Sequence, residues 1–319
     1  MSSKLFIAGA AVALWLGIVL QGDAHAEGAE RLRVMTFNIW VGGESSGQPL
    51  TQIAKVIESA QADVVGVQES HGEKRNGKSH NGALAVAQLL GWHYFDQGDE
   101  GTSILSRFPI VAHTPNKYGA ALELPSGRRV WLFNVHFAHT PYQPYQLLDI
   151  PYNDAPFFKT AEEAVGAARV ARGQQVAALL AEIDGVRSDE TPILITGDFN
   201  EPSALDWTDA VAEAKRCPVS VAWPATATLQ DAGFVDAYRQ AHPDPLKSPG
   251  FTWTPLTAEC DPQDRHDRID FVFVADNAGK VQSAEVVGES LEHADIVVAP
   301  YPSDHRAVVA TIEIESLPR

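Results

Sequence analysis

The stretch YPSDHRAVVATIEI, residues 301–314, places an acid, an imidazole and a guanidinium directly before a run of apolar residues. These three side chains belong to Asp304, His305 and Arg306, and the run that follows has the length and composition of a buried strand. Charged residues at the start of a strand often do no more than face water. The other interpretation is that Asp304 and His305 hold a metal ion and activate a water molecule. The rest of the chain decides between these two interpretations.

An apolar strand that ends on a polar residue is a pattern that recurs along the chain. The recurring segments are FN, QE, SR, NVH, GDFN, RID and SDH. Singly, Asn and Asp at such positions are explained by turn preference, because their side chains bond to nearby backbone. Together, these carboxylates, amides and imidazoles favour a hard divalent cation with oxygen ligands and histidines that move protons. Zinc would need several Cys or His ligands at close spacing, and the sequence has no glycine-rich phosphate loop.

Helical and strand patterns alternate through the rest of the sequence. Residues 49–60, 83–90 and about 160–183 have helical spacing, whereas residues 101–137 read as strands in series joined by hairpins. Strands that both alternate with helices and follow one another predict an α/β fold with two mixed sheets and helices outside. Because no linker rich in Pro, Gly or Ser interrupts the chain, we expect a single domain.

In their order along the chain, FNIW, QES, SRFP, NVHF, GDFN, RIDFVF and SDH resemble the endonuclease/exonuclease/phosphatase superfamily, the metal-dependent phosphoesterases typified by deoxyribonuclease I. The resemblance covers residues 33–314, and the ordered set is specific although each motif is short. It implies a four-layer αββα sandwich with two mixed β-sheets and a site at the strand ends along one edge.

The resemblance also implies a role for each matching residue. The implied catalytic residues are His136, Asp198, Asn200, Asp270 and His305. The implied metal ligands are Glu69 and Asp304, with Mg²⁺ as the expected ion and Mn²⁺ or Ca²⁺ as alternatives. The implied substrate contacts are Asn38, Arg107 and Asn134. Asp198 would orient or deprotonate the attacking water, and Asp270 would keep His305 oriented and cationic. A structural ion pair explains Arg107 equally well.

Charge and one aromatic segment bear on the substrate. The net charge of −17 disfavours a nucleic-acid partner without excluding one, because a bound divalent cation can reverse the local field. Residues 138–159, AHTPYQPYQLLDIPYNDAPFFK, carry three Tyr, two Phe and four Pro. They predict either a stiff loop packed on the sandwich or a wall beside the phosphate that contacts an organic substituent.

These features favour a metal-dependent phosphoesterase that acts on a small-molecule phosphoester or a lipid headgroup. A deoxyribonuclease I-like endonuclease and a non-catalytic phosphate-binding module are the alternatives. Two branches of the superfamily fit less well. Trp40 stands where the abasic-site endonucleases have an acid, and the twelve residues PLTAECDPQDRH separate Trp253–Thr254 from Asp267, which stretches the 5-phosphatase signature.

The N-terminus and the cysteines concern export. Residues 1–26 have one Lys, an uncharged run from Leu5 to Leu20 and a final Ala-His-Ala, which is typical of a signal peptide. We therefore expect a catalytic domain at residues 27–319, without a transmembrane segment, in the periplasm or outside the cell. In such a compartment Cys217 and Cys260 would form a disulfide or remain as two buried thiols, and the sequence favours the disulfide.

Overall fold

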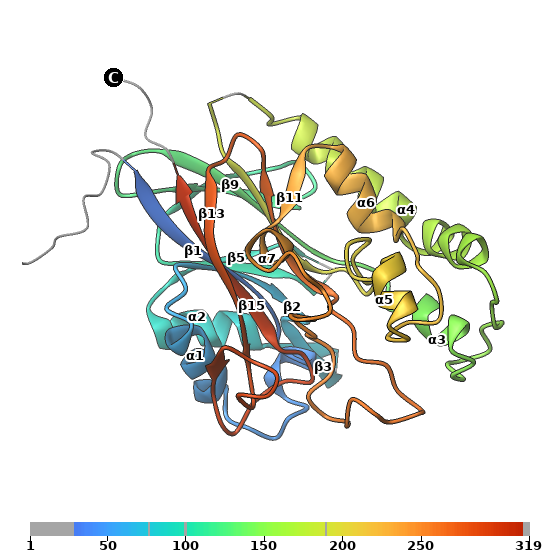
Figure 1. The fold of residues 1–319 in the computed structure, drawn as a ribbon. Coiled ribbons are helices and arrows are strands. Elements are labelled where there is room, and N and C mark those ends of the chain that lie inside the picture. The colour runs from blue at the N-terminus through green and yellow to red at the C-terminus, as the bar shows by residue number, and fades with distance from the viewer. Residues whose placement is uncertain (1–28, 76, 99–100, 189, 315–319) are drawn as a thin grey trace, which may run out of the picture.

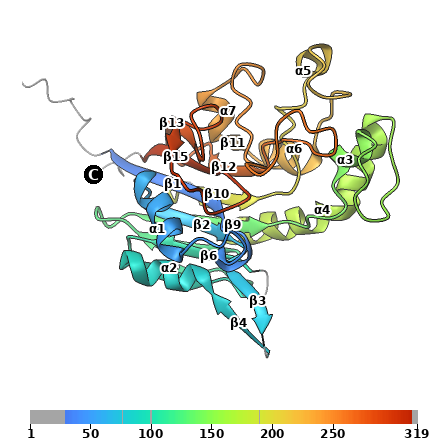
Figure 2. The ribbon, with the colours of Figure 1, turned by 90° about the horizontal axis from the view of Figure 1, so that it is seen from below.

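Two mixed β-sheets packed face to face form the centre of the molecule (Figures 1 and 2). The computed structural model describes residues 29–75, 77–98, 101–188 and 190–314, so the predicted signal peptide lies outside the described residues. Helices cover the outer face of each sheet. The predicted α/β sandwich in a single domain is therefore confirmed.

The first sheet has the strand order β14-β13-β15-β1-β2-β6-β5. Its strands are β1 (Glu30–Asn38), β2 (Val64–Gln68), β5 (His93–Asp96), β6 (Ser103–Ser106), β13 (Lys280–Gly288), β14 (Ile296–Val297) and β15 (Ala307–Ile314). β1 lies parallel to β2 and antiparallel to β15. Helices α1 (Leu50–Ser59) and α2 (Gly82–Leu90) cover its outer face.

The second sheet has the order β11-β12-β10-β9-β8-β7. Its strands are β7 (Ile110–His113), β8 (Gly119–Glu123), β9 (Arg129–His136), β10 (Ile193–Asp198), β11 (Phe234–Asp236) and β12 (Asp270–Ala275). Helices α4 (Ala161–Asp184) and α6 (Pro224–Asp231) pack on its outer face (Figure 1). The Thr160 side chain accepts a hydrogen bond from the backbone N–H of Glu163, and the Glu163 side chain accepts one from the backbone N–H of Thr160. This capping box satisfies backbone amides at the start of α4.

The alternation of side chains along the central strands builds two apolar layers. In β1, Leu32 and Val34 point into the core between the sheets, whereas Met35 and Phe37 pack with the α1 residue Ile53. All five side chains are 0–1% exposed. A strand covered on both faces is rigid, and that rigidity fixes the position of whatever residue follows its end.

Shorter elements fill the connections. They are η1 (Val41–Gly43), β3 (His71–Arg75), β4 (Lys78–Asn81), α3 (Gln143–Leu147), α5 (Asp209–Glu213) and α7 (Ala237–Ala241). Helix α3 lies within the aromatic segment 138–159, for which the sequence predicted a stiff loop or a wall beside the phosphate. Pro144 occupies an early position of α3, where its missing N–H would have no partner in the helix.

The predicted disulfide is wrong. Cys217 is buried in the apolar cluster around Trp207 and Trp223, whereas Cys260 is exposed, and both carry free thiols. Burial raises the pKa of the Cys217 thiol to about 11, so this thiol is inert at neutral pH. No helix in the described ranges combines the length and the apolar character needed to cross a bilayer.

Candidate active site

The register of the two sheets gathers the predicted residues at one edge. In the first sheet Asn38 pairs with Gln68, which Glu69 follows. In the second sheet Asp198 pairs with both His136 and Asp270. The carboxyl ends of parallel neighbours lie at the same sheet edge, and an antiparallel neighbour begins there. Strand β15 begins at this edge because it runs antiparallel to β1, which places Asp304 and His305 there too.

Asp198 occupies the centre of this group. Its Oδ2 accepts a hydrogen bond from Nδ2 of Asn38 at 3.0 Å, and its Oδ1 accepts from the backbone N–H of Asn200 at 2.9 Å. Nε2 of His136 lies 3.5 Å from Oδ2, and Nε2 of His305 lies 3.7 Å from it. The carboxylate, which is fully buried, thus faces two imidazoles and an amide. This arrangement suits a base or an acceptor for a water molecule between the rings.

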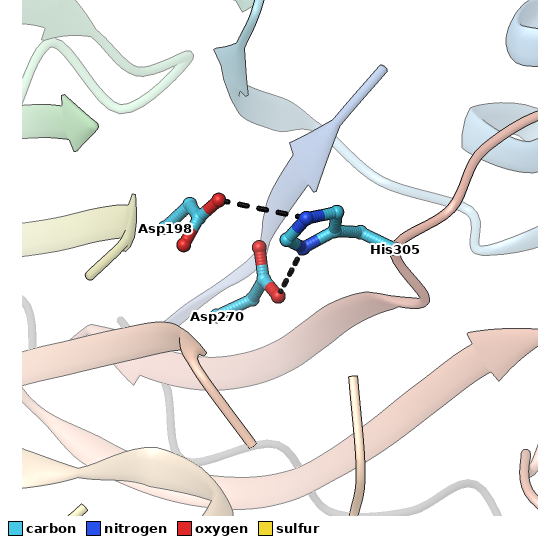
Figure 3. A group of neighbouring side chains, drawn as sticks. All are labelled: Asp198, Asp270 and His305. Atoms are coloured by element: carbon cyan, nitrogen blue, oxygen red, sulfur yellow. Dashed lines mark hydrogen bonds and ion pairs between the residues drawn. The ribbon is translucent and has the colours of Figure 1, made fainter. Parts of the chain in front are cut away.

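His305 lies between two carboxylates, as Figure 3 shows. Its Nδ1 is 3.0 Å from Oδ2 of Asp270, and its Nε2 faces Asp198. Burial lowers the pKa of His305, but the negative charges of Asp270 and Asp198 outweigh burial and raise that pKa well above its ordinary value. The raised pKa favours the cationic imidazole, in which both ring nitrogens are donors. The three side chains are close enough to one another to share a metal ion, but a doubly protonated imidazole is a hydrogen-bond donor and not a ligand.

Glu69 and Asp304 fit a divalent cation better. Oε2 of Glu69 accepts from the backbone N–H of Val41 at 2.7 Å, and Oε1 accepts from Asn38 at 3.2 Å. Burial raises the pKa of Asp304 to about 6, an effect that His305 opposes and the charge of Glu69 reinforces. Oδ1 of Asp304 is buried without a hydrogen-bond partner. Two mutually repelling carboxylates, one of which has a buried oxygen without a hydrogen-bond partner, are oxygen ligands of the kind that Mg²⁺ prefers.

The backbone is constrained where two of these residues follow strands. Glu69 has φ 52° and Asn200 has φ 48°, both in the left-handed region that costs a non-glycine residue of order 1 kcal/mol. The Asn200 side chain donates to the backbone carbonyl of Phe137 at 3.1 Å, which holds the end of β10 against the end of β9. Strained residues held by surrounding hydrogen bonds are characteristic of functional sites.

Above these residues lies a cavity of about 220 Å³. Its lining residues are Glu69, His136, His139, Tyr142, Tyr145, Tyr152, Asp198, Asn200, Trp253, Ile269, Asp304 and His305. We call Tyr142, Tyr145, Tyr152 and Trp253 the aromatic wall. Their rings contact one another at centroid distances of 5.1–6.0 Å, and the ring of Trp253 lies 6.4 Å from that of His305. Neither Lys nor Arg is among the described residues that line the cavity.

Arg107 is not brought to this edge. It follows β6, which runs antiparallel to β2 with Ser106 opposite Val64, so Arg107 lies at the opposite end of β2 from Glu69. Its side chain is 58% exposed and forms an ion pair with Asp63 at 3.0 Å. The predicted substrate contact is wrong, and the structural ion pair is correct.

Two predicted substrate contacts are buried amides. Asn134 is 1% exposed between the sheets, where its Nδ2 donates to the backbone carbonyl of Val67 and to Oε1 of Gln97. Asn38 is 0% exposed, and its Nδ2 is shared between Glu69 and Asp198. Neither side chain lines the cavity in the described part of the chain. Asn134 joins the two sheets, and Asn38 joins the two carboxylates.

The fold and these side chains together define the class of the protein. A two-sheet sandwich whose edge carries acids, amides and imidazoles is the framework of metal-dependent hydrolases of phosphoric esters. The family model of the endonuclease/exonuclease/phosphatase family matches residues 35–305. The chain belongs to this family.

The similar proteins include one curated sequence and several solved structures. The uncharacterized protein F14F9.5 of Caenorhabditis elegans is 29% identical over 300 residues, covering 88% of this chain and 90% of that protein. An endonuclease/exonuclease/phosphatase from Beutenbergia cavernae has a TM-score of 0.56 and 21% identity over 89% of this chain and 72% of its own. The 3′ phosphatase NExo from Neisseria, bound to a product DNA hairpin, has a TM-score of 0.55 and 22% identity over 88% of this chain and 98% of its own. These structures share the fold.

Some functional residues escaped the sequence-based prediction. The aromatic segment was recognised, but Trp253 was noted only for its distance from Asp267 and not as a neighbour of His305. Trp253 pairs through its backbone with both Asp267 and His305, contacts that span 14 and 52 residues of sequence. A pairing between distant segments has no local signal, although Trp253 sits in the alternating run FTWT.

Proposed function

We propose that the protein is an exported, divalent-metal-dependent phosphoesterase that hydrolyses a small-molecule or lipid-like phosphoester by attack of water. The observation that carries the proposal is the cavity in which Asp198, His136 and His305 face an aromatic wall. Acids and imidazoles provide the chemistry of phosphoester hydrolysis, and aromatic rings provide contact area for an organic substituent.

Each side chain has a role in this reaction. Asp198 accepts the proton of the attacking water, because its Oδ2 faces the space between the two imidazoles. His305, kept cationic and oriented by Asp270, stabilises the charge that develops on the phosphoryl oxygens. His136, whose Nε2 also lies close to Asp198, donates to a phosphoryl oxygen.

Glu69 and Asp304 would hold the divalent cation, for which Mg²⁺ is the first candidate and Mn²⁺ or Ca²⁺ are alternatives. When bound, the cation supplies positive charge that neutralises the phosphoryl group and polarises it. Asn38 donates to Glu69 and Asp198 at once, so it keeps the metal-binding and the proton-accepting carboxylates in a fixed relation.

The choice of a small or lipid-like ester rests on charge. A surface that follows a polynucleotide backbone needs frequent Lys and Arg, whereas the described cavity lining has none, and the chain carries a net charge of −17. Export rests on residues 1–26, whose sequence is typical of a signal peptide, and N-terminal sequencing of the mature protein tests it.

The test is hydrolysis by the exported protein of bis(p-nitrophenyl) phosphate, p-nitrophenyl phosphate and p-nitrophenyl phosphorylcholine in Mg²⁺, beside nicking of supercoiled plasmid. We expect turnover of at least one small ester, and its loss on addition of EDTA and in Asp198→Ala. Arg107→Ala is the matched control, because its ion pair lies at the opposite sheet end, and it should retain full activity.

Plasmid nicking that disappears with EDTA and in Asp198→Ala would make the protein a nuclease and overturn the substrate assignment. Phosphate binding without turnover of any ester or plasmid, by folded protein in Mg²⁺, would make it a non-catalytic binding module.

A further inference from the structure

Two segments that are far apart in sequence meet behind the aromatic wall. Tyr142 directly precedes α3 and Tyr145 lies in it, whereas the loop of residues 255–267 comes more than 100 residues later in the sequence. The backbones of Trp253 and Asp267 pair with each other at the neck of this loop, through hydrogen bonds of 2.9 and 3.1 Å. The loop is thus anchored where Trp253 enters the wall.

Asp267 is a fully engaged buried carboxylate at this neck. Its Oδ2 accepts from the hydroxyl of Tyr142 at 2.8 Å, and its Oδ1 accepts from Nε1 of Trp207 at 2.9 Å and Nε of Arg265 at 3.2 Å. The side chain is 2% exposed. A buried carboxylate with three donors is held rigidly, so the Tyr142 ring that it binds is held as well.

Asp264, which is half-buried, binds the hydroxyl of the second tyrosine. Its Oδ1 accepts from the hydroxyl of Tyr145, and its Oδ2 accepts from the hydroxyl of Thr257 within the loop. Within the described ranges, neither Asp264 nor Asp267 lines the cavity. Both tyrosine hydroxyls are therefore directed away from the cavity and toward the loop, which leaves carbon surface of the rings beside the phosphate site.

We infer that Asp264 and Asp267 are positioning residues that set the specificity of the site for phosphoesters with a planar, aromatic organic group. The inference rests on the proposed function, of which it names the selective element. A ring has two side-chain torsions, and a hydroxyl tied to a fixed carboxylate leaves little freedom in either. A pre-ordered wall stacks on a flat substituent without the cost of ordering its own side chains on binding.

The alternative role for the tyrosines is proton donation to the leaving group. Burial, reinforced by Asp267, raises the pKa of Tyr142 well above its ordinary value, and burial and Asp264 raise that of Tyr145. Each hydroxyl proton is already donated to a carboxylate outside the cavity. The geometry therefore favours contact through the rings over acid catalysis.

The experiment compares Asp264→Ala with Asp264→Asn, which keeps an oxygen acceptor for Tyr145. Asp261→Ala is the matched control, since Asp261 lies in the same loop and its Oδ1 accepts from the nearby backbone N–H of Gln263 instead of from the aromatic wall. Tyr145→Phe removes the hydroxyl and keeps the ring. Titration calorimetry measures binding of phenylphosphonate and of methylphosphonate in Mg²⁺, and steady-state kinetics use phenyl and methyl p-nitrophenyl phosphate.

The wild type should prefer phenylphosphonate to methylphosphonate. Asp264→Ala and Tyr145→Phe should each reduce this preference by about three- to tenfold, the usual effect of one aromatic contact. They should raise KM for the phenyl ester by the same factor, with kcat changed less than twofold. The methyl ester should be unaffected in Asp264→Ala, and Asp264→Asn should restore the wild-type preference.

The inference is overturned if the wild type shows no preference for the phenyl compound, or if Asp264→Ala keeps the wild-type preference or weakens both phosphonates equally. A wild type that hydrolyses neither of these esters, nor any of the three small esters named for the proposed function, overturns the proposed function instead. In that case the ratio of the affinities for phenylphosphonate and methylphosphonate still tests the positioning role of Asp264, because calorimetry measures binding without turnover.

Discussion

Replacement of Arg172 by Met should destabilise the protein strongly, because Arg172 is the partner of a buried acid. Arg172 lies in α4 with 1% of its side chain exposed, and its Nη1 is 3.5 Å from Oε2 of Glu201, which is 0% exposed. The same guanidinium donates to Oε1 of Gln143 at 2.6 Å and to the backbone carbonyl of Pro141 at 3.0 Å. It therefore joins α4, the residue after Asn200 and the aromatic segment.

The magnitude follows from what the substitution leaves behind. Removal of one partner of a buried ion pair costs about 3–5 kcal/mol, because the remaining charge has neither water nor counter-ion. The other oxygen of Glu201, Oε1, keeps its hydrogen bond from the backbone N–H of Ala225 at 2.7 Å, so the loss is concentrated on Oε2. Two lost hydrogen bonds add about 1 kcal/mol each. Met preserves much of the volume, which limits any cavity contribution.

The effect depends on pH with a defined sign. Burial raises the pKa of Glu201 from 4.5 to about 7, although Arg172 opposes the shift. A carboxyl with a raised pKa contributes stability that is fully present below the unfolded pKa and is lost as pH rises through the folded pKa. The difference between the unfolded and folded pKa values of Glu201 corresponds to a loss of about 3 kcal/mol in the free energy of unfolding between pH 4.5 and 7. Glu201→Gln should remove this slope, because the amide does not titrate.

Urea denaturation at pH 5 and pH 8, followed by circular dichroism, measures these effects. We expect Arg172→Met to lose more stability at pH 8 than at pH 5, and Glu201→Gln to lose less stability between the two pH values than the wild type does. Arg169→Met is the control, since Arg169 is exposed one turn earlier in α4. An Arg172→Met protein within 1 kcal/mol of the wild type at pH 8 would refute the reasoning. An unchanged pH slope in Glu201→Gln would do the same.

Three further predictions concern the site and the thiols. Glu69→Gln should weaken Mg²⁺ binding at least about tenfold by calorimetry, because a charged ligand becomes neutral, and an unchanged affinity would remove Glu69 from the metal site. Asp270→Asn should lower kcat about 10²- to 10⁴-fold and lower the pKa of His305, which NMR titration of the imidazole measures. A variant with the wild-type kcat and the wild-type pKa of His305 would show that Asp270 does not keep this imidazole cationic. Ellman's reagent should modify Cys260 rapidly in the folded protein and Cys217 only after unfolding. If no free thiol were detected even in the unfolded protein, the two cysteines would form the disulfide that the sequence favoured.

The sequence predicted, for a topological reason, that polar residues gather at one sheet edge. Asn38, Glu69, His136 and Asp198 follow or end strands that lie parallel to a neighbour, so their ends meet wherever the strands are paired. Arg107 has the same local signature, but it follows a strand that is antiparallel to β2, and strand direction is not visible in a short motif. The residues that meet at this edge and Arg107, which does not, thus differ in strand pairing, which is a long-range property.

The side-chain direction within a strand explains the other error. Asn134, which the resemblance implied to contact substrate, lies two residues before His136 in β9 and therefore shares its face. One step further from the edge, however, that face is covered by the opposing sheet, where the backbone of Val67 accepts from the amide. Burial therefore changes between Asn134 and His136, and the amino-acid composition of the strand does not reveal where the edge of the sheet lies.

The charges around the cavity indicate how the substrate is selected. In a chain with a net charge of −17 and a cavity lining without Lys or Arg in the described residues, the cations next to a phosphoryl group are His305 and the metal ion that Glu69 and Asp304 would hold. Among esters of the same charge, such a site discriminates little through the phosphoryl group, because it contacts phosphoryl atoms that these esters share. Discrimination must then come from the organic substituent, and the surface that this substituent meets is the aromatic wall. The carboxylates of Asp264 and Asp267, which hold that wall without entering the cavity, therefore influence selectivity more than catalytic rate.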